Sequence, residues 1–280
     1  MKSSNENQHQ EINTEKINEF VNDVINRNKI PGAALAIIKD SKVLYKNYYG
    51  LAAIEYKLPV NHKTIFKMHS LAKIFTSVGI FRLIEQKKIT LSSVISKFFE
   101  DIPPKWQNIQ IHHLLSHSSG LPDIARYYNL PEHDAKQRVF QDAIKFPPGE
   151  KFDYCQTNYW LLRQIISQVS QEKFRDFIIS HQFGSGEQEV QFCTSTDIVP
   201  NIAREYRPNA KGELKIMNFD LPEYLYGATG LGITLEKMIE WDQKLNQNIL
   251  LEDSTKKQML KEFIYTHEPK HFASGWEILN

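Results

Sequence analysis

The segment FKMHSLAKIFT at residues 66–76 places Ser70 where an apolar repeat begins and Lys73 three residues later. Because residues three apart share one face of a helix, the lysine amine lies within reach of the serine hydroxyl. A serine hydroxyl becomes a nucleophile when a base removes its proton, and a lysine serves as that base where its surroundings disfavour the ammonium form. The same residues also fit a serine that caps a helix, followed by a solvated lysine. The segment alone therefore leaves a catalytic and a structural interpretation open.

The chain around this segment contains several helical patterns. Apolar residues that recur every three or four positions predict helices at about 12–27, 71–86, 92–99, 111–116, 157–169, 236–246 and 254–263. The helix at 71–86 is expected to be amphipathic, with one apolar face.

Other stretches favour strands. Two β-rich runs, at 33–38 and 43–49, are joined by the polar residues 39–42 and predict an antiparallel hairpin. Residues 184–222 predict short strands and loops, and residues 274–279 predict the start of a strand. The chain is therefore expected to mix α and β structure.

Two further segments follow the serine-lysine pair. Residues 114–122 read LLSHSSGLP, and residues 148–159 read PGEKFDYCQTNY. A glycine turn then precedes a helix with Trp-Asp within 227–241, and Gly-Trp stands at 275–276. In this order the segments resemble the serine β-lactamase-related family, which includes class C β-lactamases, penicillin-binding D-alanyl-D-alanine carboxypeptidases and related esterases. The resemblance runs from about Glu11 to the last residue.

The resemblance implies a mixed α+β fold of the β-lactamase/transpeptidase type, in which helices flank an antiparallel sheet and a mainly helical lobe adjoins it. After a polar tail at residues 1–11, a single domain is expected at 12–280. Its α/β part would comprise about 12–65 with 225–280, and its mainly helical part about 66–224. The family's remaining strands would lie beyond the end of the chain. The chain is therefore expected to be truncated, and its sheet to lack its last strands and expose an edge.

The resemblance also assigns roles to individual side chains. It makes Ser70 the nucleophile that becomes acylated, Lys73 its proton partner, and Tyr154 the tyrosine of the family's Tyr-x-Asn element. A phenol near a lysine ammonium loses its proton more readily and can relay protons to a leaving group and then to water. The three side chains are expected to meet in a cleft between the two lobes. Without the family pattern, Tyr154 would be interpreted as an aromatic residue that packs after a Pro-Gly turn.

Two departures from the family pattern affect this site. Gln156 stands where the family usually has asparagine, which keeps an amide for a substrate's carbonyl but lengthens its reach by one methylene. The family's Lys/His-x-Gly element completes the oxyanion hole and offers a cation to a substrate carboxylate. None of the 12 glycines has Lys, His or Arg two residues before it, and the nearest match, Ala228-Thr229-Gly230, lacks the cation.

The sequence therefore predicts a serine hydrolase that attacks an amide or ester carbonyl through an acyl-enzyme on Ser70. A β-lactamase, a D-alanyl-D-alanine peptidase and an esterase are the candidate activities. The alternative is a catalytically impaired member or fragment of the family, which binds or becomes acylated without efficient turnover. The expected partner is a small molecule or peptide with a carbonyl group, and the sequence leaves its identity and the oligomeric state open.

Metal and cofactor chemistry is not predicted, because the proposed reaction needs only side chains. His113 and His117 are four residues apart, but no acidic neighbour completes a His-Glu-x-x-His zinc site, and in the family pattern His117 is a structural loop residue. Cys155 is predicted to be a small buried residue rather than a reactive thiol. With Cys193 as the only other cysteine, a disulfide scaffold and a multi-thiolate zinc site are excluded.

Composition excludes several other classes of protein. The 280 residues are 41% hydrophobic and 24% charged, as in folded rather than disordered chains. With 34 Lys+Arg against 33 Asp+Glu, the chain lacks the cationic surplus that nucleic-acid binding requires. No apolar run of about 18 residues predicts a membrane span. Met1–Gln10 lacks the apolar core of a secretory signal, whereas the resemblance suggests a periplasmic or secreted protein, so the compartment stays open between these and the cytoplasm.

Overall fold

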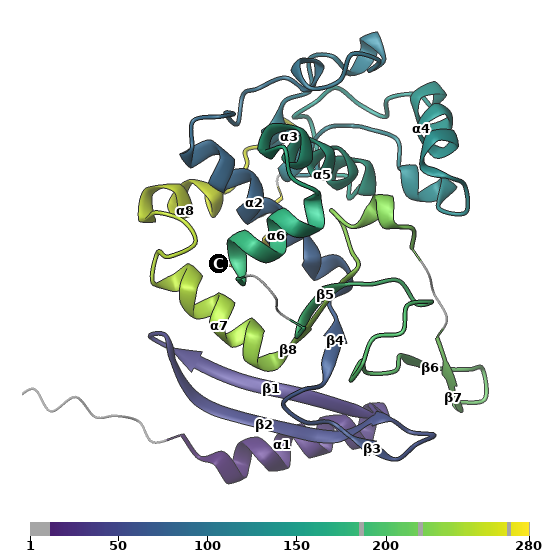
Figure 1. Ribbon diagram of the computed structural model, residues 1–280, viewed down its shortest axis with the longest axis vertical. Helices are drawn as coiled ribbons and strands as arrows, with labels where there is room; N and C mark the ends of the chain where they lie inside the picture. The colour runs from purple at the N-terminus through teal and green to yellow at the C-terminus, as the bar shows by residue number, and fades with distance from the viewer. Residues whose placement is uncertain (1–11, 185–187, 218–220, 268–269, 280) are drawn as a thin grey trace, which may run out of the picture.

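The computed structural model describes residues 12–184, 188–217, 221–267 and 270–279. The polar tail predicted at residues 1–11 lies outside these residues. Figure 1 shows a small sheet with one helix against it at one end of the molecule and a group of helices at the other end, with two smaller sheets beside them. All pairs of named strands are antiparallel. The predicted mixed α+β fold is therefore confirmed.

The first sheet contains the predicted hairpin. It consists of β1 (Gly32–Lys39), β2 (Lys42–Ala53) and β3 (Leu58–Pro59), paired in that order, with β1 at one edge. Asp40 and Ser41 form the two-residue turn between β1 and β2, and their φ angles are 50° and 60°. Turns with positive φ at both positions match the right-handed twist of the two strands. The hairpin prediction is confirmed, and β2 extends further than predicted.

Helix α1 (Thr14–Asn28) covers the hairpin sheet, as Figure 1 shows. It begins after Asn13, whose side chain accepts a hydrogen bond from the Lys16 N–H at 2.9 Å. Such a cap satisfies a backbone donor that the first turn of a helix leaves unpaired. The hydroxyl groups of Tyr45 and Tyr49 on β2 donate to the side-chain oxygen of Asn18, which fixes the helix against the sheet.

Two smaller sheets follow. β4 (Ile65–Lys67), β8 (Leu231–Thr234) and β5 (Val190–Phe192) pair in the order β4-β8-β5, while β6 (Tyr206–Pro208) pairs with β7 (Leu214–Ile216). The described part of 184–222 thus holds short strands and loops, as predicted. Among the described residues, the antiparallel strands are grouped into three sheets. β4 ends at Lys67, three residues before Ser70, and so fixes where the serine-lysine pair begins.

The helical part is built around α2 (Lys73–Glu85), which follows a short 3-10 helix at His69–Ala72. The other helices are α3 (Ile111–Leu115), α4 (Glu132–Gln141), α5 (Gln156–Ser170), α6 (Phe174–Gln182), α7 (Leu235–Asn246) and α8 (Asp253–Met259). Among the helices of the described ranges, none has both the length and the apolar character that crossing a membrane requires.

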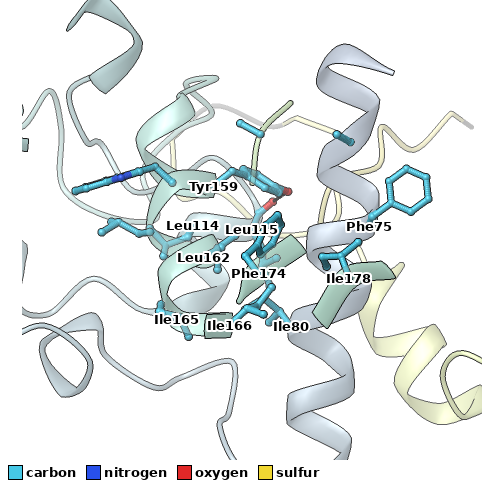
Figure 2. Close-up of a cluster of buried hydrophobic side chains, with 14 of the residues drawn as sticks. Phe75, Ile80, Leu114, Leu115, Tyr159, Leu162, Ile165, Ile166, Phe174 and Ile178 are labelled. Carbon is cyan, nitrogen blue, oxygen red and sulfur yellow. Dashed lines mark hydrogen bonds between the residues drawn. The ribbon is translucent and has the colours of Figure 1, made fainter. Parts of the chain in front are cut away.

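Helix α2 is buried on nearly all sides, so the amphipathic pattern predicted for it is wrong. Side chains from Lys73 to Phe81, and Leu83, are all buried. The physical reason is that α5, α6 and α8 all contact α2, which leaves it no continuous face toward water. Figure 2 shows part of this core, in which Ile80 of α2 lies near Ile166 of α5, whereas Phe75 projects from the opposite side of α2, away from α5.

Three predicted elements differ from the structure. The helix predicted at 92–99 is only a 3-10 turn at Ile95–Lys97, because the neighbouring backbone pairs with residues 109–111 instead. The helix predicted at 254–263 ends at Met259. Residues 274–279 form no strand, and only an isolated bridge joins Phe272 to Glu277, because Gly275 adopts a φ of 95° and turns the chain.

Candidate active site

Ser70 and Lys73 lie where β4 passes into α2. The Met68 N–H after β4 donates to the Leu231 carbonyl of β8 at 2.8 Å, and the 3-10 helix then carries Ser70. Ser70 is exposed, whereas Lys73 is only 3% exposed. The residues that cap the 3-10 helix and α2 are Met68 and Ala72, neither with a side-chain capping bond. The structural interpretation, a capping serine followed by a solvated lysine, is therefore wrong.

The surroundings of the Lys73 amine are mostly apolar or aromatic. Its Nζ donates one hydrogen bond to the Ala228 carbonyl at 3.0 Å and lies 4.7 Å from the ring centre of Tyr154 and 5.4 Å from that of Tyr159. Burial lowers the pKa of Lys73 to about 7, while the charge of Asp123 acts in the opposite direction. Near neutral pH, a substantial fraction of this lysine is therefore an uncharged amine, the form that accepts a proton.

Tyr154 faces this amine with its ring. It is 42% exposed, and its hydroxyl is in hydrogen-bonding contact with the side chains of Ser70 and Gln156. Burial raises the pKa of the Tyr154 phenol above its usual value, and those two hydrogen bonds partly oppose the rise. The structure thus brings together all four side chains that the sequence singled out, Ser70, Lys73, Tyr154 and Gln156.

Asp123 is a charged residue of this site that the sequence analysis missed. Its Oδ1 accepts the N–H of Ala125 at 3.0 Å and the N–H of Gln156, the first residue of α5, at 3.1 Å. It therefore fixes the start of α5, and its carboxylate raises the pKa of Lys73. A signal was available, because Asp123 directly follows the LLSHSSGLP segment and aspartate readily accepts backbone N–H groups at helix starts.

The segment Ala228-Thr229-Gly230 also belongs to the site, through its backbone. The carbonyl of Gly227 accepts the Thr76 hydroxyl at 2.7 Å, next to the Ala228 carbonyl that accepts Lys73. A Cβ atom at Gly227 would lie 2.2 Å from the Tyr159 carbonyl oxygen, so only glycine fits where this segment crosses α5. Gly227 and Ala228 thus bring two carbonyl oxygens to α2, and Ala228-Thr229-Gly230 brings no cationic side chain.

The histidines and cysteines have separate environments. His113 Nδ1 accepts the Gln110 N–H at 3.1 Å, whereas His117 Nδ1 accepts the Cys155 N–H at 3.2 Å. Within the described ranges, no group of three or more His, Cys, Asp or Glu side chains is arranged to hold a metal ion. Cys155 is 1% exposed, and burial raises the pKa of its thiol to about 12. The prediction of a small buried residue at this position is confirmed.

Comparisons with known proteins bear on the family and the fold of this chain. Residues 15–273 match the family model described as Beta-lactamase. The chain is 26% identical over 277 residues to penicillin-binding protein 4* of Bacillus subtilis (strain 168). The matched region covers 91% of this chain and 61% of that protein. The chain spans less than two thirds of the length of the first curated relatives it matches.

Solved structures share the fold. The octameric penicillin-binding protein homologue from Pyrococcus abyssi superposes with a TM-score of 0.78 at 23% identity, over 94% of this chain and 64% of that one. EstCE1, a hydrolase with promiscuous acyltransferase activity, gives a TM-score of 0.76 at 21% identity, over 93% of this chain and 81% of that one. Because the family model matches nearly the whole chain and the fold agrees, this chain belongs to the beta-lactamase family.

Proposed function

We propose that this chain is a serine hydrolase that transfers the acyl group of an amide or ester first to Ser70 and then to water. The observation that carries the proposal is the buried Lys73, with a pKa of about 7, beside an exposed serine and a tyrosine hydroxyl. A base with a pKa near the working pH combines the correct protonation state with sufficient strength to take a proton.

In the proposed acylation step, the Lys73 amine accepts the Ser70 proton while Ser70 Oγ bonds to the carbonyl carbon of the substrate. The carbonyl oxygen carries the negative charge, and the C–N or C–O bond to the leaving group then breaks. The Tyr154 hydroxyl gives its proton to the leaving group and regains one from the Lys73 ammonium. Both side chains thereby return to their starting states, and the acyl group is held as an ester on Ser70.

In the proposed deacylation step, a water molecule attacks the same carbonyl carbon. Its proton passes through Tyr154 to Lys73, and the bond from Ser70 Oγ to the acyl carbon breaks as Ser70 regains its proton. The Ser70 N–H lies in the first helical turn and supplies one donor to the oxyanion. The Gln156 amide, which contacts the Tyr154 hydroxyl, is in place to hold the amide or carbonyl of a small-molecule or peptide substrate.

A second candidate function is acylation without efficient turnover. It is favoured by one specific observation, the absence of Lys, His or Arg two residues before any of the 12 glycines. A site with one oxyanion donor and no cation stabilises both transition states less than a site that has a second donor and a cation. The relative EstCE1, with its hydrolase and acyltransferase activities, supports acyl transfer as the shared chemistry but does not decide between the two candidates.

The test is covalent labelling of the intact protein with a fluorophosphonate and with a penicillin, followed by peptide mapping. A mass increase on the peptide that contains Ser70 is expected with at least one reagent. Nitrocefin and p-nitrophenyl esters then measure turnover, which supports the hydrolase if it is sustained and the second candidate if labelling occurs without it. Folded protein that neither reagent labels at Ser70 would contradict both functions.

Asp123→Asn is predicted to move the acid limb of the pH–rate profile to lower pH. The amide keeps Oδ1 as acceptor for the N–H groups of Ala125 and Gln156 but removes the charge that raises the pKa of Lys73. The Lys73 pKa therefore falls further. We expect the acid limb of the kcat/KM profile for a p-nitrophenyl ester to move about 0.5–1 pH unit to lower pH. The control is Asp153→Asn, because Asp153 pairs with Lys145 at 2.5 Å instead. An acid limb that stays or moves to higher pH would refute the prediction.

A further inference from the structure

His117 is a fully buried imidazole with one nitrogen engaged twice. It follows α3 in a loop, with a φ of 55° and no exposed surface. Its Nδ1 lies 3.2 Å from the Cys155 N–H donor and 3.0 Å from the Asn158 amide nitrogen. The Asn158 oxygen accepts the Ser119 hydroxyl at 2.5 Å, which orients that amide so that its NH₂ donates to the imidazole. Nδ1 is thus an acceptor, and the ring proton belongs on Nε2.

The other nitrogen and the ring faces meet aromatic side chains. Nε2 is buried and has no hydrogen-bond partner within the described residues. The ring centre of His117 lies 4.4 Å from that of Tyr154 and 5.2 Å from that of Tyr159, both tilted by 35°. Phe152 and Phe272 lie farther out, each with a ring centre 5.7 Å away. The imidazole therefore fills an aromatic pocket whose nearest member is Tyr154.

Several charged and titratable groups surround this ring. Lys73 approaches from α2, Tyr159 from α5, and Tyr154 and Cys155 from the turn before α5. Burial, followed by the charge of Lys73, lowers the pKa of His117 well below its ordinary value. A neutral imidazole adds no charge beside Lys73. Its ring packs against Tyr154 and Tyr159, the two rings that lie over the Lys73 amine, and so supports the burial of that amine.

We infer that His117 is a positioning residue for Tyr154. It holds Tyr154 twice, by contact with its ring and by accepting the backbone N–H of the next residue, Cys155. Tyr154 in turn meets both Lys73, 4.7 Å from its ring centre, and the hydroxyl of Ser70. The inference rests on the proposed function, since it explains how the proton relay between Ser70 and Lys73 keeps its geometry and its low water content.

Two variants separate the two contacts of the imidazole. His117→Asn places Oδ1 where Nδ1 stands and accepts the same N–H groups, and asparagine tolerates a positive φ, but the ring is lost. His117→Phe keeps a ring beside Tyr154 and loses the acceptor. The control is His113→Asn, which removes a ring from the same chain segment, where Nδ1 accepts the Gln110 N–H and the ring packs on His112.

In His117→Asn, kcat/KM for a p-nitrophenyl ester is expected to fall about 10- to 100-fold, because Tyr154 is less well placed. Water also gains access to Lys73, so the acid limb moves about one unit to higher pH as the burial that lowers the pKa of Lys73 is relieved. His113→Asn is expected to leave the acid limb unchanged, and His117→Phe to keep it near its wild-type position.

NMR titration of protein with ¹³Cε-labelled lysine follows Lys73 directly and does not require turnover. A Lys73 titration that moves to higher pH in His117→Asn but not in His113→Asn supports the inference. An unchanged Lys73 titration and pH profile in His117→Asn overturns it and leaves His117 a residue of the fold only. Failure of the proposed function has a different signature, the absence of any label at Ser70 in the wild-type protein.

Discussion

Ser70→Ala is expected to abolish covalent labelling and to reduce turnover of nitrocefin and p-nitrophenyl esters to background, a loss of roughly 10⁴-fold or more. The reason is that the proposed acyl-enzyme forms on Ser70 Oγ, and no other group can take over that bond. The loss of stability is expected to be small, within about 0.5 kcal/mol, because Ser70 is exposed and caps no helix. Intact-mass spectrometry, initial rates and thermal unfolding measure these three effects.

The matched control is Ser92→Ala, an exposed serine on a different segment of the helical part. It should label and turn over like the wild-type protein. If Ser70→Ala retains its label while Ser92→Ala loses it, the nucleophile has been assigned to the wrong serine. If both variants keep wild-type turnover, the hydrolysis proceeds without an acyl-enzyme on either residue.

The sequence predicted those parts of the fold that depend on neighbouring residues. The hairpin of β1 and β2 has alternating apolar runs on either side of a polar connector, and its turn needs only Asp40 and Ser41. Helix α5 likewise appears as a local repeat of apolar residues after a Pro-Gly turn. The burial of α2 could not be predicted in this way, because it arises from helices that begin at Gln156 or later, 71 or more residues after α2 ends at Glu85, which a local pattern does not register.

The candidate site also has features that the sequence predicts and features that depend on distant segments. The spacing of Ser70 and Lys73 and the presence of Tyr154 are visible in the sequence, and the structure brings them together. The low pKa of Lys73 arises from tertiary structure, because it depends on burial beneath the Ala228 carbonyl and the Tyr159 ring. A residue's solvation cannot be inferred from its own segment when the covering groups come from distant segments.

Lys73→Met is expected to lower kcat/KM by about 10²- to 10⁴-fold, the range typical for loss of a general base. Methionine nearly matches the lysine stem in volume, so the site stays filled while the proton acceptor is removed. The acid limb near pH 7, which the Lys73 pKa of about 7 sets, should disappear from whatever activity remains. Activity that persists with the same acid limb would show that another group takes the Ser70 proton.

The same variant tests the Lys73 pKa through stability, without any substrate. In the unfolded chain this amine keeps its proton up to about pH 10.4, whereas in the folded protein it loses it near pH 7. Between pH 7 and 9 the unfolded state therefore binds more protons, and the free energy of unfolding rises by up to about 1.4 kcal/mol per pH unit. Above pH 9, the Cys155 thiol, with its pKa raised to about 12, acts in the opposite direction, so the window ends there.

Lys73→Met should lose this rise, whereas the exposed Lys63→Met should keep it, as denaturant unfolding at pH 7 and 9 would measure. Equal slopes in all three proteins would mean that Lys73 stays protonated when folded, and the amine could not act as the base.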